Sequence, residues 1–210
     1  MIPSDPLALF LFGLVLGASA GFAPGPHMSV VLLETLRHDA KAGVQVAMAP
    51  LITDWPMVFV SVAFYHFVAD ADPVVGTISL IGGLFLVWLG WKSMTVAPPG
   101  PGDVGGPRRS LQKGALVNLL NPNAWIFWFT IGAPIVTIGA QVGITPPVLF
   151  FVTFYALLVG IKSGIAYALH GSRRFLGSIG YLWTNSVLGG LLIVFAFIFL
   201  RDAMARFGLL

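Results

Sequence analysis

A helix-breaking hexapeptide of sequence GFAPGP, residues 21–26, interrupts a long apolar run near the start of the chain. Residues 7–23 carry no charge, and apolar residues resume shortly after the break. Because Pro24 and Pro26 have no N–H to donate, the carbonyls four residues before them lose their helical partners. In hydrocarbon, such carbonyls are tolerated only inside protein or beside a polar cavity. A kink filled by neighbouring helices is the alternative, but we favour a discontinuous membrane helix that lines a site, as in many secondary transporters.

The composition places the chain among membrane proteins. Of its 210 residues, 57% are hydrophobic and 9% are charged, and the mean hydropathy is +0.91. A soluble chain would be about 25% charged. Several apolar stretches exceed the roughly 20 residues that a helix needs to cross a bilayer. The basic residues lie in short loops and form no patch for nucleic acid. We therefore predict an all-α polytopic membrane protein embedded in the lipid bilayer.

Six membrane helices can be read from the apolar stretches and the signals that separate them. Their approximate ranges are 7–34, 43–67, 74–95, 111–138, 147–170 and 181–201. Residues 97–110 form a linker rich in proline and glycine. This linker divides the chain into a first half, 1–96, and a second half, 111–210. Each half is predicted to hold three helices.

The distribution of lysine and arginine predicts the orientation. Eight of these residues lie in or beside the loops that follow the first, third and fifth helices. Two lie at the C-terminal end, and none lies at the N-terminus or in the loops after the second and fourth helices. Positive loops stay in the cytoplasm. The linker is therefore predicted to be cytoplasmic, and both termini are predicted to lie outside.

The two halves contain an internal repeat. The segment LIGGLFLV at 80–87 matches VLGGLLIV at 187–194, which lies 107 residues later. At an offset of 108, Asp54 in the second helix matches Lys162 in the fifth. The first break matches Asn121-Pro122 in the fourth helix at an offset of about 96–98. Since three helices is an odd number, the halves must insert in opposite orientations. The sequence thus predicts two inverted three-helix repeats with broken first and fourth helices, which meet at one cavity.

Asp54 and Lys162 are the strongest candidates for a functional role. Asp54 lies eleven residues into its helix, about 16 Å along the axis and near the bilayer centre. Ionisable groups at this depth are costly and generally functional. A structural pair with the similarly deep Lys162 is the simpler interpretation, but buried pairs contribute little net stability. We expect the two groups to pair when the site is empty. A zwitterionic substrate would replace that pair, and protonation of Asp54 from outside would favour its release.

Other polar residues lie at the breaks. His27 could relay protons, contact substrate, or pack against backbone carbonyls. Asn118 is expected to face a cavity and Asn121 to satisfy freed backbone groups. Trp128 is expected to serve packing. The chain has no cysteine and shows no catalytic triad, zinc-ligand spacing or phosphate-binding glycine loop. These patterns predict no metal, no cofactor and no enzymatic activity.

The chain resembles the LysE/RhtB family of exporters over essentially its whole length. The resemblance rests on GFAPGPH at 21–27, Gly43, Asp54 and KGALVNLLNPN at 113–123. It implies a six-helix exporter of amino acids or related small molecules that is driven by the proton gradient. It also implies the cytoplasmic (inner) membrane of a prokaryote. The residues that match the family pattern, and that would bind substrate or couple its export, are Pro24, Gly25, Pro26, Asp54, Asn121 and Pro122. Lys162 is not part of that pattern, so its role rests on the repeat alone.

Three other functions remain open at this stage. An intramembrane enzyme could use Asp54 with His27, but it would need a nucleophile or a metal set. A passive channel or scaffold would not explain deep charges beside helix breaks. An exporter of a cation or another small solute is weakened because Glu34 is the only other carboxylate within the predicted helices. Homo-oligomerisation is also left open.

Overall fold

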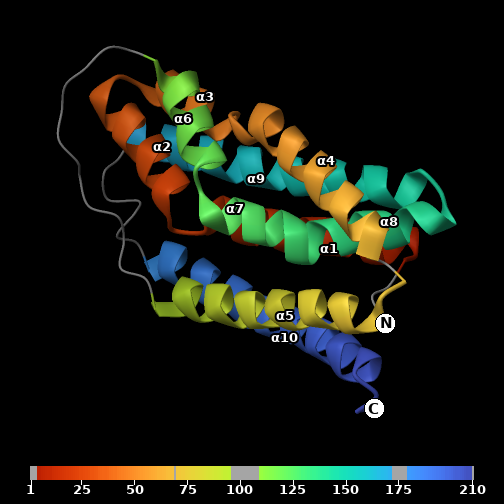
Figure 1. Ribbon diagram of the computed structural model, residues 1–210. Coiled ribbons are helices and arrows are strands. Elements are labelled where there is room, and N and C mark those ends of the chain that lie inside the picture. Colours follow the sequence, from red (N-terminus) through yellow and green to blue (C-terminus); the bar gives the residue numbers. More distant parts are fainter. Residues whose placement is uncertain (1–3, 69, 96–108, 172–178, 210) are drawn as a thin grey trace.

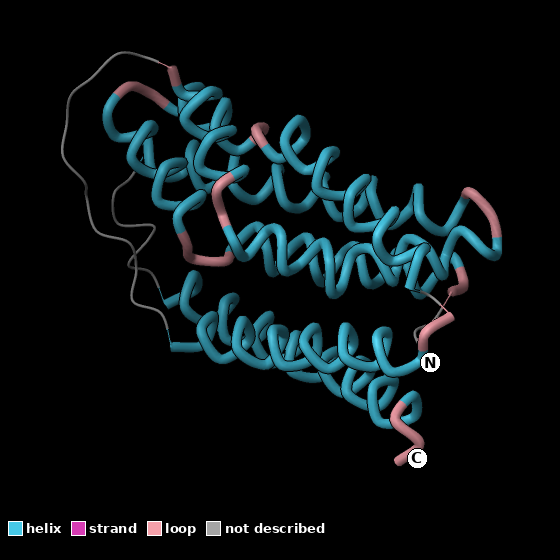
Figure 2. Tube along the Cα trace, viewed as in Figure 1, coloured by secondary structure: helices cyan, strands magenta, loops and turns pink. Residues whose placement is uncertain are grey.

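The computed structural model describes the chain except residues 1–3, 69, 96–108, 172–178 and 210. The elements of this described part are all helical (Figures 1 and 2). They are α1 Pro6–Phe22, α2 Pro26–Arg37, α3 Ala40–Ala47, α4 Pro50–Val68, α5 Asp72–Thr95, α6 Ser110–Leu119, α7 Pro122–Phe127, the π-helix η1 Trp128–Gly132, α8 Ala133–Val142, α9 Thr145–Gly171 and α10 Ile179–Arg206.

The helices agree with the predicted membrane segments. Four segments of the described residues are long and apolar enough to cross a membrane: Ala40–Val68, Asp72–Lys92, Pro122–Val142 and Thr145–His170. The pair α1 and α2, bent by 57° at the GFAPGP break, passes the same test when taken together and is a candidate for a fifth span. The chain is therefore a multi-pass helical membrane protein. The sixth predicted segment coincides with α10, and its crossing stays a prediction. The predicted linker and the loop before α10 lie largely outside the described residues.

Local sequence signals fix several helix starts. Asp5 Oδ1 accepts a hydrogen bond from the backbone N–H of Ala8 at 2.9 Å, which caps α1. Asp39 Oδ1 caps α3 in the same way, with the N–H of Ala42 at 2.8 Å. Pro26 opens α2, where its missing N–H costs nothing because the first turn has no acceptor for it.

Small residues bring α1 against α9. Gly13, Gly17 and Gly21 lie at spacings of four and face α9 at successively later residues, so the two helices run parallel. A Cβ added at Gly17 would lie 2.5 Å from the carbonyl oxygen of Phe154. Close backbone contact of this kind replaces the missing hydrophobic driving force between helices in lipid. It joins a helix of the first half to one of the second.

Helices α5 and α10 form an antiparallel pair that lies beside the rest of the bundle (Figure 1). Their backbones approach closely at Gly90 and Gly189. At the opposite end of the pair, Asp202 Oδ2 accepts hydrogen bonds from Ser79 Oγ at 2.9 Å and Arg206 Nε at 3.0 Å. This pair again combines one helix from each half.

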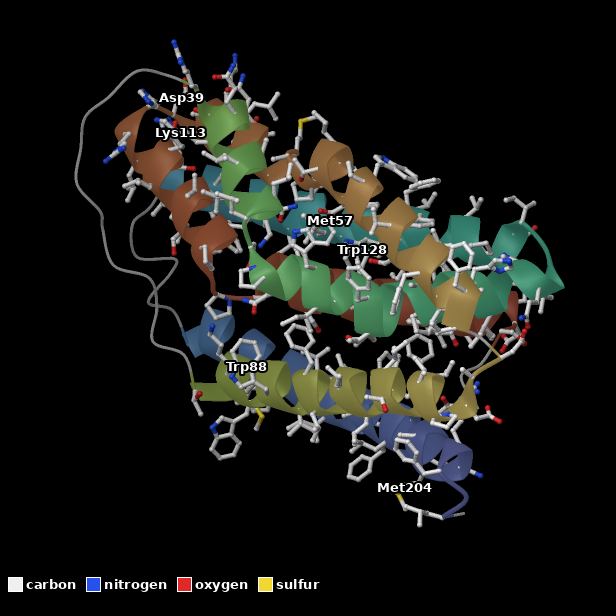
Figure 3. The ribbon with its side chains drawn as sticks, in the orientation of Figure 1. Asp39, Met57, Trp88, Lys113, Trp128 and Met204 are labelled. Carbon is white, nitrogen blue, oxygen red and sulfur yellow. The ribbon has the colours of Figure 1, made fainter. Side chains whose placement is uncertain are left out.

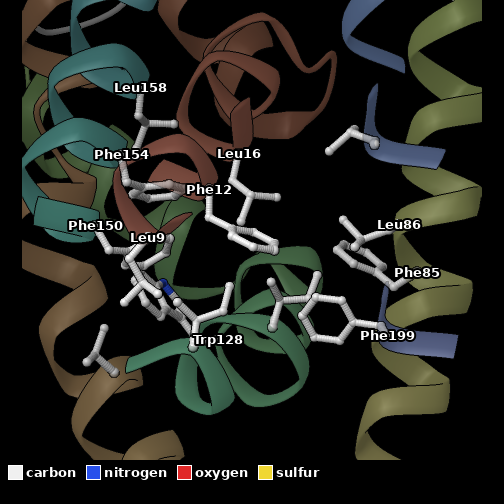
Figure 4. Close-up of a cluster of buried hydrophobic side chains, with 14 of the residues drawn as sticks. Leu9, Phe12, Leu16, Phe85, Leu86, Trp128, Phe150, Phe154, Leu158 and Phe199 are labelled. Atoms are coloured by element: carbon white, nitrogen blue, oxygen red, sulfur yellow. The ribbon is translucent and has the colours of Figure 1, made fainter. Parts of the chain in front are cut away.

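Aromatic side chains fill the core where α1, α9 and η1 meet (Figure 4). Trp128 and Phe150 are fully buried, and Phe12 and Phe154 are nearly so. Phe150 and Phe154 stack with their ring centroids 5.7 Å apart. A gap of methyl size in such a core costs about 1 kcal/mol in lost packing contacts. The cluster forms a dense apolar layer below the site described next.

A second group of contacts joins α2, α3 and α6 at one end of the molecule (Figure 1). Glu34 of α2 is fully buried there. Its carboxylate accepts hydrogen bonds from Ser110 Oγ and from Lys113 Nζ, each at 2.6 Å. Lys113 of α6 stands near the outer surface of this group (Figure 3). This ionic contact joins α2 to α6, which are the shorter segments of the two broken helices.

Candidate functional site

One cavity of about 130 Å³ lies where the breaks of the first and fourth helical spans come together. Its floor is buried, and its rim near the breaks is partly exposed. Of the predicted site residues, eight line the cavity: Pro24, Gly25, Pro26, His27, Asp54, Asn118, Asn121 and Lys162. Pro122 is not among the lining residues and begins α7. Aromatic residues of the core, Phe127, Trp128 and Phe154, close its apolar side.

The first break separates α1 from α2 without backbone strain. Gly25 has a φ of 167°, which is ordinary extended backbone, and a Cβ added there would meet no atom within 4 Å. Lys162 Nζ of α9 donates a hydrogen bond to the carbonyl oxygen of Gly21 at 3.3 Å. This carbonyl lies in the last turn of α1, where the helix dipole favours a cation. The ammonium group therefore stabilises the broken end of α1.

The second break is stabilised by side chains on both sides of it. Asn121 Oδ1 accepts from the backbone N–H of Asn123 at 3.2 Å and caps α7, as expected for Asn121. Trp125 Nε1 donates to the carbonyl oxygen of Leu119 at 2.9 Å, which satisfies the end of α6. The polar groups that lipid could not solvate are thus paired within the protein.

Asp54 is held by donors from three other elements. Asn118 Nδ2 of α6 donates to Oδ1 at 2.6 Å, and the Tyr155 hydroxyl of α9 donates to Oδ2 at 3.2 Å. The indole of Trp128 donates to the same carboxylate. Asn118 also donates to Thr53 Oγ1 at 2.8 Å, which fixes the orientation of its amide. The carboxylate is 4% exposed and well solvated by the protein.

The predicted contact between Asp54 and Lys162 is not formed. Among the described residues, the ion pairs and hydrogen bonds include no contact between these two side chains. Asp54 takes its donors from uncharged side chains, and Lys162 binds a helix end. The physical reason is that each charged group forms hydrogen bonds with nearer residues: Asp54 with Asn118 and Tyr155, and Lys162 with the carbonyl oxygen of Gly21. The expectation of a direct pair in the empty site is therefore wrong, although both groups line one cavity.

Lys162 has donors to spare. Its side chain is 3% exposed, and its one hydrogen bond within the described part of the chain is the 3.3 Å contact with Gly21. An ammonium group carries three donors. A buried cation with unused donors is unfavourable unless an anion reaches it. The cavity can therefore receive an anionic group at Lys162.

His27 forms a hydrogen bond with a backbone carbonyl, which is one of the three roles considered for it. Its Nε2 lies 3.1 Å from the carbonyl oxygen of Val46, to which it must donate. This carbonyl has no helical i+4 donor because Pro50, four residues later, lacks an N–H, and it also accepts from the N–H of Ala49 at 3.0 Å. The ring also lines the cavity. His27 thus fastens α2 to the start of the second span.

Several residues of the site escaped the sequence reasoning. Tyr155 precedes Lys162 by seven residues, so two helical turns place both on one face of α9, and this spacing could have revealed it. Trp128 was assigned to packing alone, but its indole also contacts Asp54. Lys92 of α5 lines the cavity, although its place beside Trp88 and Trp91 suggests a purely interfacial role.

A bundle of apolar helices, two of them broken beside a charged cavity, is the architecture of a membrane transporter. The model of the LysE type translocator family matches residues 18–203. Because this match covers most of the chain, the protein belongs to this family. The protein is therefore a multi-pass membrane exporter of small solutes. No curated protein and no solved structure matches the chain.

Proposed function

We propose that the protein exports an amino acid or a similar zwitterionic metabolite in exchange for protons. The observation that carries this proposal is that a buried carboxylate, Asp54, and a buried ammonium, Lys162, line the same cavity and do not bind each other. The substrate carboxylate would occupy the unused donors of Lys162. Its ammonium group would approach Asp54. Binding would then leave neither charge bare.

Proton coupling would act through Asp54. A carboxylate binds an ammonium group only while it is ionised. A proton that arrives from outside would neutralise Asp54 and weaken its hold on the substrate ammonium. Release outside would follow, and the proton would leave on the cytoplasmic side. Tyr155 and Asn118 would hold the carboxylate in place during both steps.

The helix contacts support an inverted repeat with six membrane helices. The first span packs on the fifth through α1 and α9, and the fourth packs on the second through α8 and α4. The third and sixth, α5 and α10, pack on each other. An inverted three-helix repeat requires this exchange of partners. The proposed boundaries are 1–96 and 111–210, with the linker in the cytoplasm and both termini outside the inner membrane of a prokaryotic cell.

Uptake into inside-out proteoliposomes would test the function. Purified protein is reconstituted, and transport of radiolabelled alanine, glutamine, threonine and lysine is measured with and without an imposed pH gradient. We expect at least one of these amino acids to move, faster with the gradient. Asp54→Asn should abolish the response to the gradient in a folded protein. If Asp54→Asn transports at the wild-type rate and keeps its pH dependence, the coupling role is wrong.

A further inference from the structure

The cavity lining contains more positive than negative side chains. Among the described lining residues, Lys162 and Lys92 are cationic and Asp54 is the only carboxylate. His27 is the remaining ionisable group, and its Nε2 is occupied by the carbonyl of Val46. A zwitterion that binds Asp54 and Lys162 would leave Lys92 without a counter-charge. This excess positive charge can therefore discriminate between substrates of different net charge.

Lys92 is well placed to contact a bound solute. It lies three residues before the end of α5, and its Nζ lies 4.8 Å from the centre of the Trp88 ring. Trp88 projects from α5 at the end of the α5–α10 pair nearer to α2 and α6 (Figure 3). A cation over an aromatic face is held in position by the ring quadrupole. The side chain is thus fixed at the partly exposed side of the cavity, while Lys162 lies at its buried side.

No carboxylate of the described chain neutralises Lys92. Among the described residues, Glu34 pairs with Lys113 and His38, and Arg206 pairs with Asp72 and Asp202. Contact with an indole leaves the N–H donors of an ammonium group available for an anion. Asp54, by contrast, already has donors from three side chains. The cavity lining therefore lacks one negative charge, which a bound solute would supply.

We propose that Lys92 is a specificity-determining residue that selects amino acids with an acidic side chain. This inference rests on the proposed export of amino acids. The α-carboxylate would bind Lys162, the ammonium would approach Asp54, and the second carboxylate would bind Lys92 at the cavity rim. A cationic amino acid would add a third positive charge and is disfavoured. The charge balance of the lining thus orders substrates as acidic, then neutral, then basic.

Competition in proteoliposomes tests this order with near-isosteric probes. The transport efficiency kcat/KM is measured for glutamate, glutamine and lysine with the full-length wild-type protein. A partly exposed ion pair favours binding by about fivefold, so we expect glutamate to exceed glutamine by about that factor. Lysine should be the poorest. Because the contact is near water, 0.5 M salt should reduce the preference of glutamate over glutamine.

Three variants separate a specific contact from a general effect of charge. Lys92→Met should lower the transport efficiency of glutamate more than that of glutamine and so remove the preference for glutamate, while Lys92→Arg should keep the preference. Lys41→Met is the matched control, because Lys41 is an exposed cation at the same predicted cytoplasmic side that does not line the cavity. It should leave the order unchanged.

The outcomes distinguish the two proposals. If glutamine moves but glutamate is not preferred, or if Lys92→Met lowers both equally, Lys92 has no selective role and the export proposal stands. If Lys41→Met erases the preference as Lys92→Met does, the effect is the surface potential and the inference is wrong. If the folded wild-type protein moves alanine or threonine but none of these three amino acids, the inference on Lys92 is wrong and the export proposal stands. If it moves no amino acid at all, both proposals fail.

Discussion

The contact of Glu34 with Lys113 should be a strong link between the two halves. Lys113→Met would leave the fully buried carboxylate of Glu34 with the Ser110 hydroxyl as its remaining close donor. Removal of one partner from a fully buried pair costs about 3–5 kcal/mol. However, 32% of the Lys113 side chain is exposed, so water can partly replace the ammonium. We therefore expect the free energy of unfolding to fall by about 2–3 kcal/mol.

A double-mutant cycle measures this link directly. Equilibrium unfolding in detergent micelles is followed by far-UV circular dichroism for Lys113→Met, Glu34→Gln and the double variant. The double variant should recover part of the loss, because the uncharged amide needs no cation, and a coupling energy of about 2 kcal/mol should result. Lys41→Met controls for the loss of an exposed lysine. A coupling below about 0.5 kcal/mol would refute the reasoning, since groups in one buried network do not behave additively.

Two further predictions concern packing and topology. Gly17→Leu should prevent correct packing of α1 on α9, because even a Cβ there would lie 2.5 Å from the Phe154 carbonyl oxygen; a strong loss of folded protein on size-exclusion chromatography is expected, and a monodisperse wild-type-like peak would contradict the close contact. A cysteine at Ala71, in a chain that otherwise has none, should react with a membrane-impermeant maleimide from outside the cell. Labelling only after the cells are opened would reverse the proposed orientation.

The sequence predicted the cavity because helix breaks in lipid have strong requirements. Freed carbonyls must be satisfied, so the break at 21–26 and the one at Asn121 had to lie within protein and near polar groups. Asp54 could be recognised for the same reason, because its depth alone marks it. These inferences depend on local chemistry and on the solvent, and neither requires knowledge of the helix packing.

The partners of the charged groups could not be predicted in this way. Matching depth suggested that Asp54 and Lys162 would bind each other. In the structure, Tyr155 and Asn118 donate hydrogen bonds to Asp54, and Lys162 instead binds the end of α1. Which donor reaches a carboxylate depends on helix rotation and on a few ångströms of packing, and neither leaves a trace in residue spacing. Lys92 was overlooked for a related reason, because a lysine beside tryptophans also fits a membrane interface.

Binding of substrates to Lys162→Met would test the central claim most directly. The claim is that the unused donors of Lys162 hold the substrate carboxylate in the cavity. Equilibrium binding in detergent is measured for alanine and for ethylamine, which lacks the carboxylate, with Lys162→Arg as the charge-conserving control. We expect Lys162→Met to weaken alanine binding by at least tenfold, as for a charge-assisted hydrogen bond of about 1.5–3 kcal/mol, and to leave ethylamine unaffected. Equal affinities of the wild type and Lys162→Met for alanine would contradict the account.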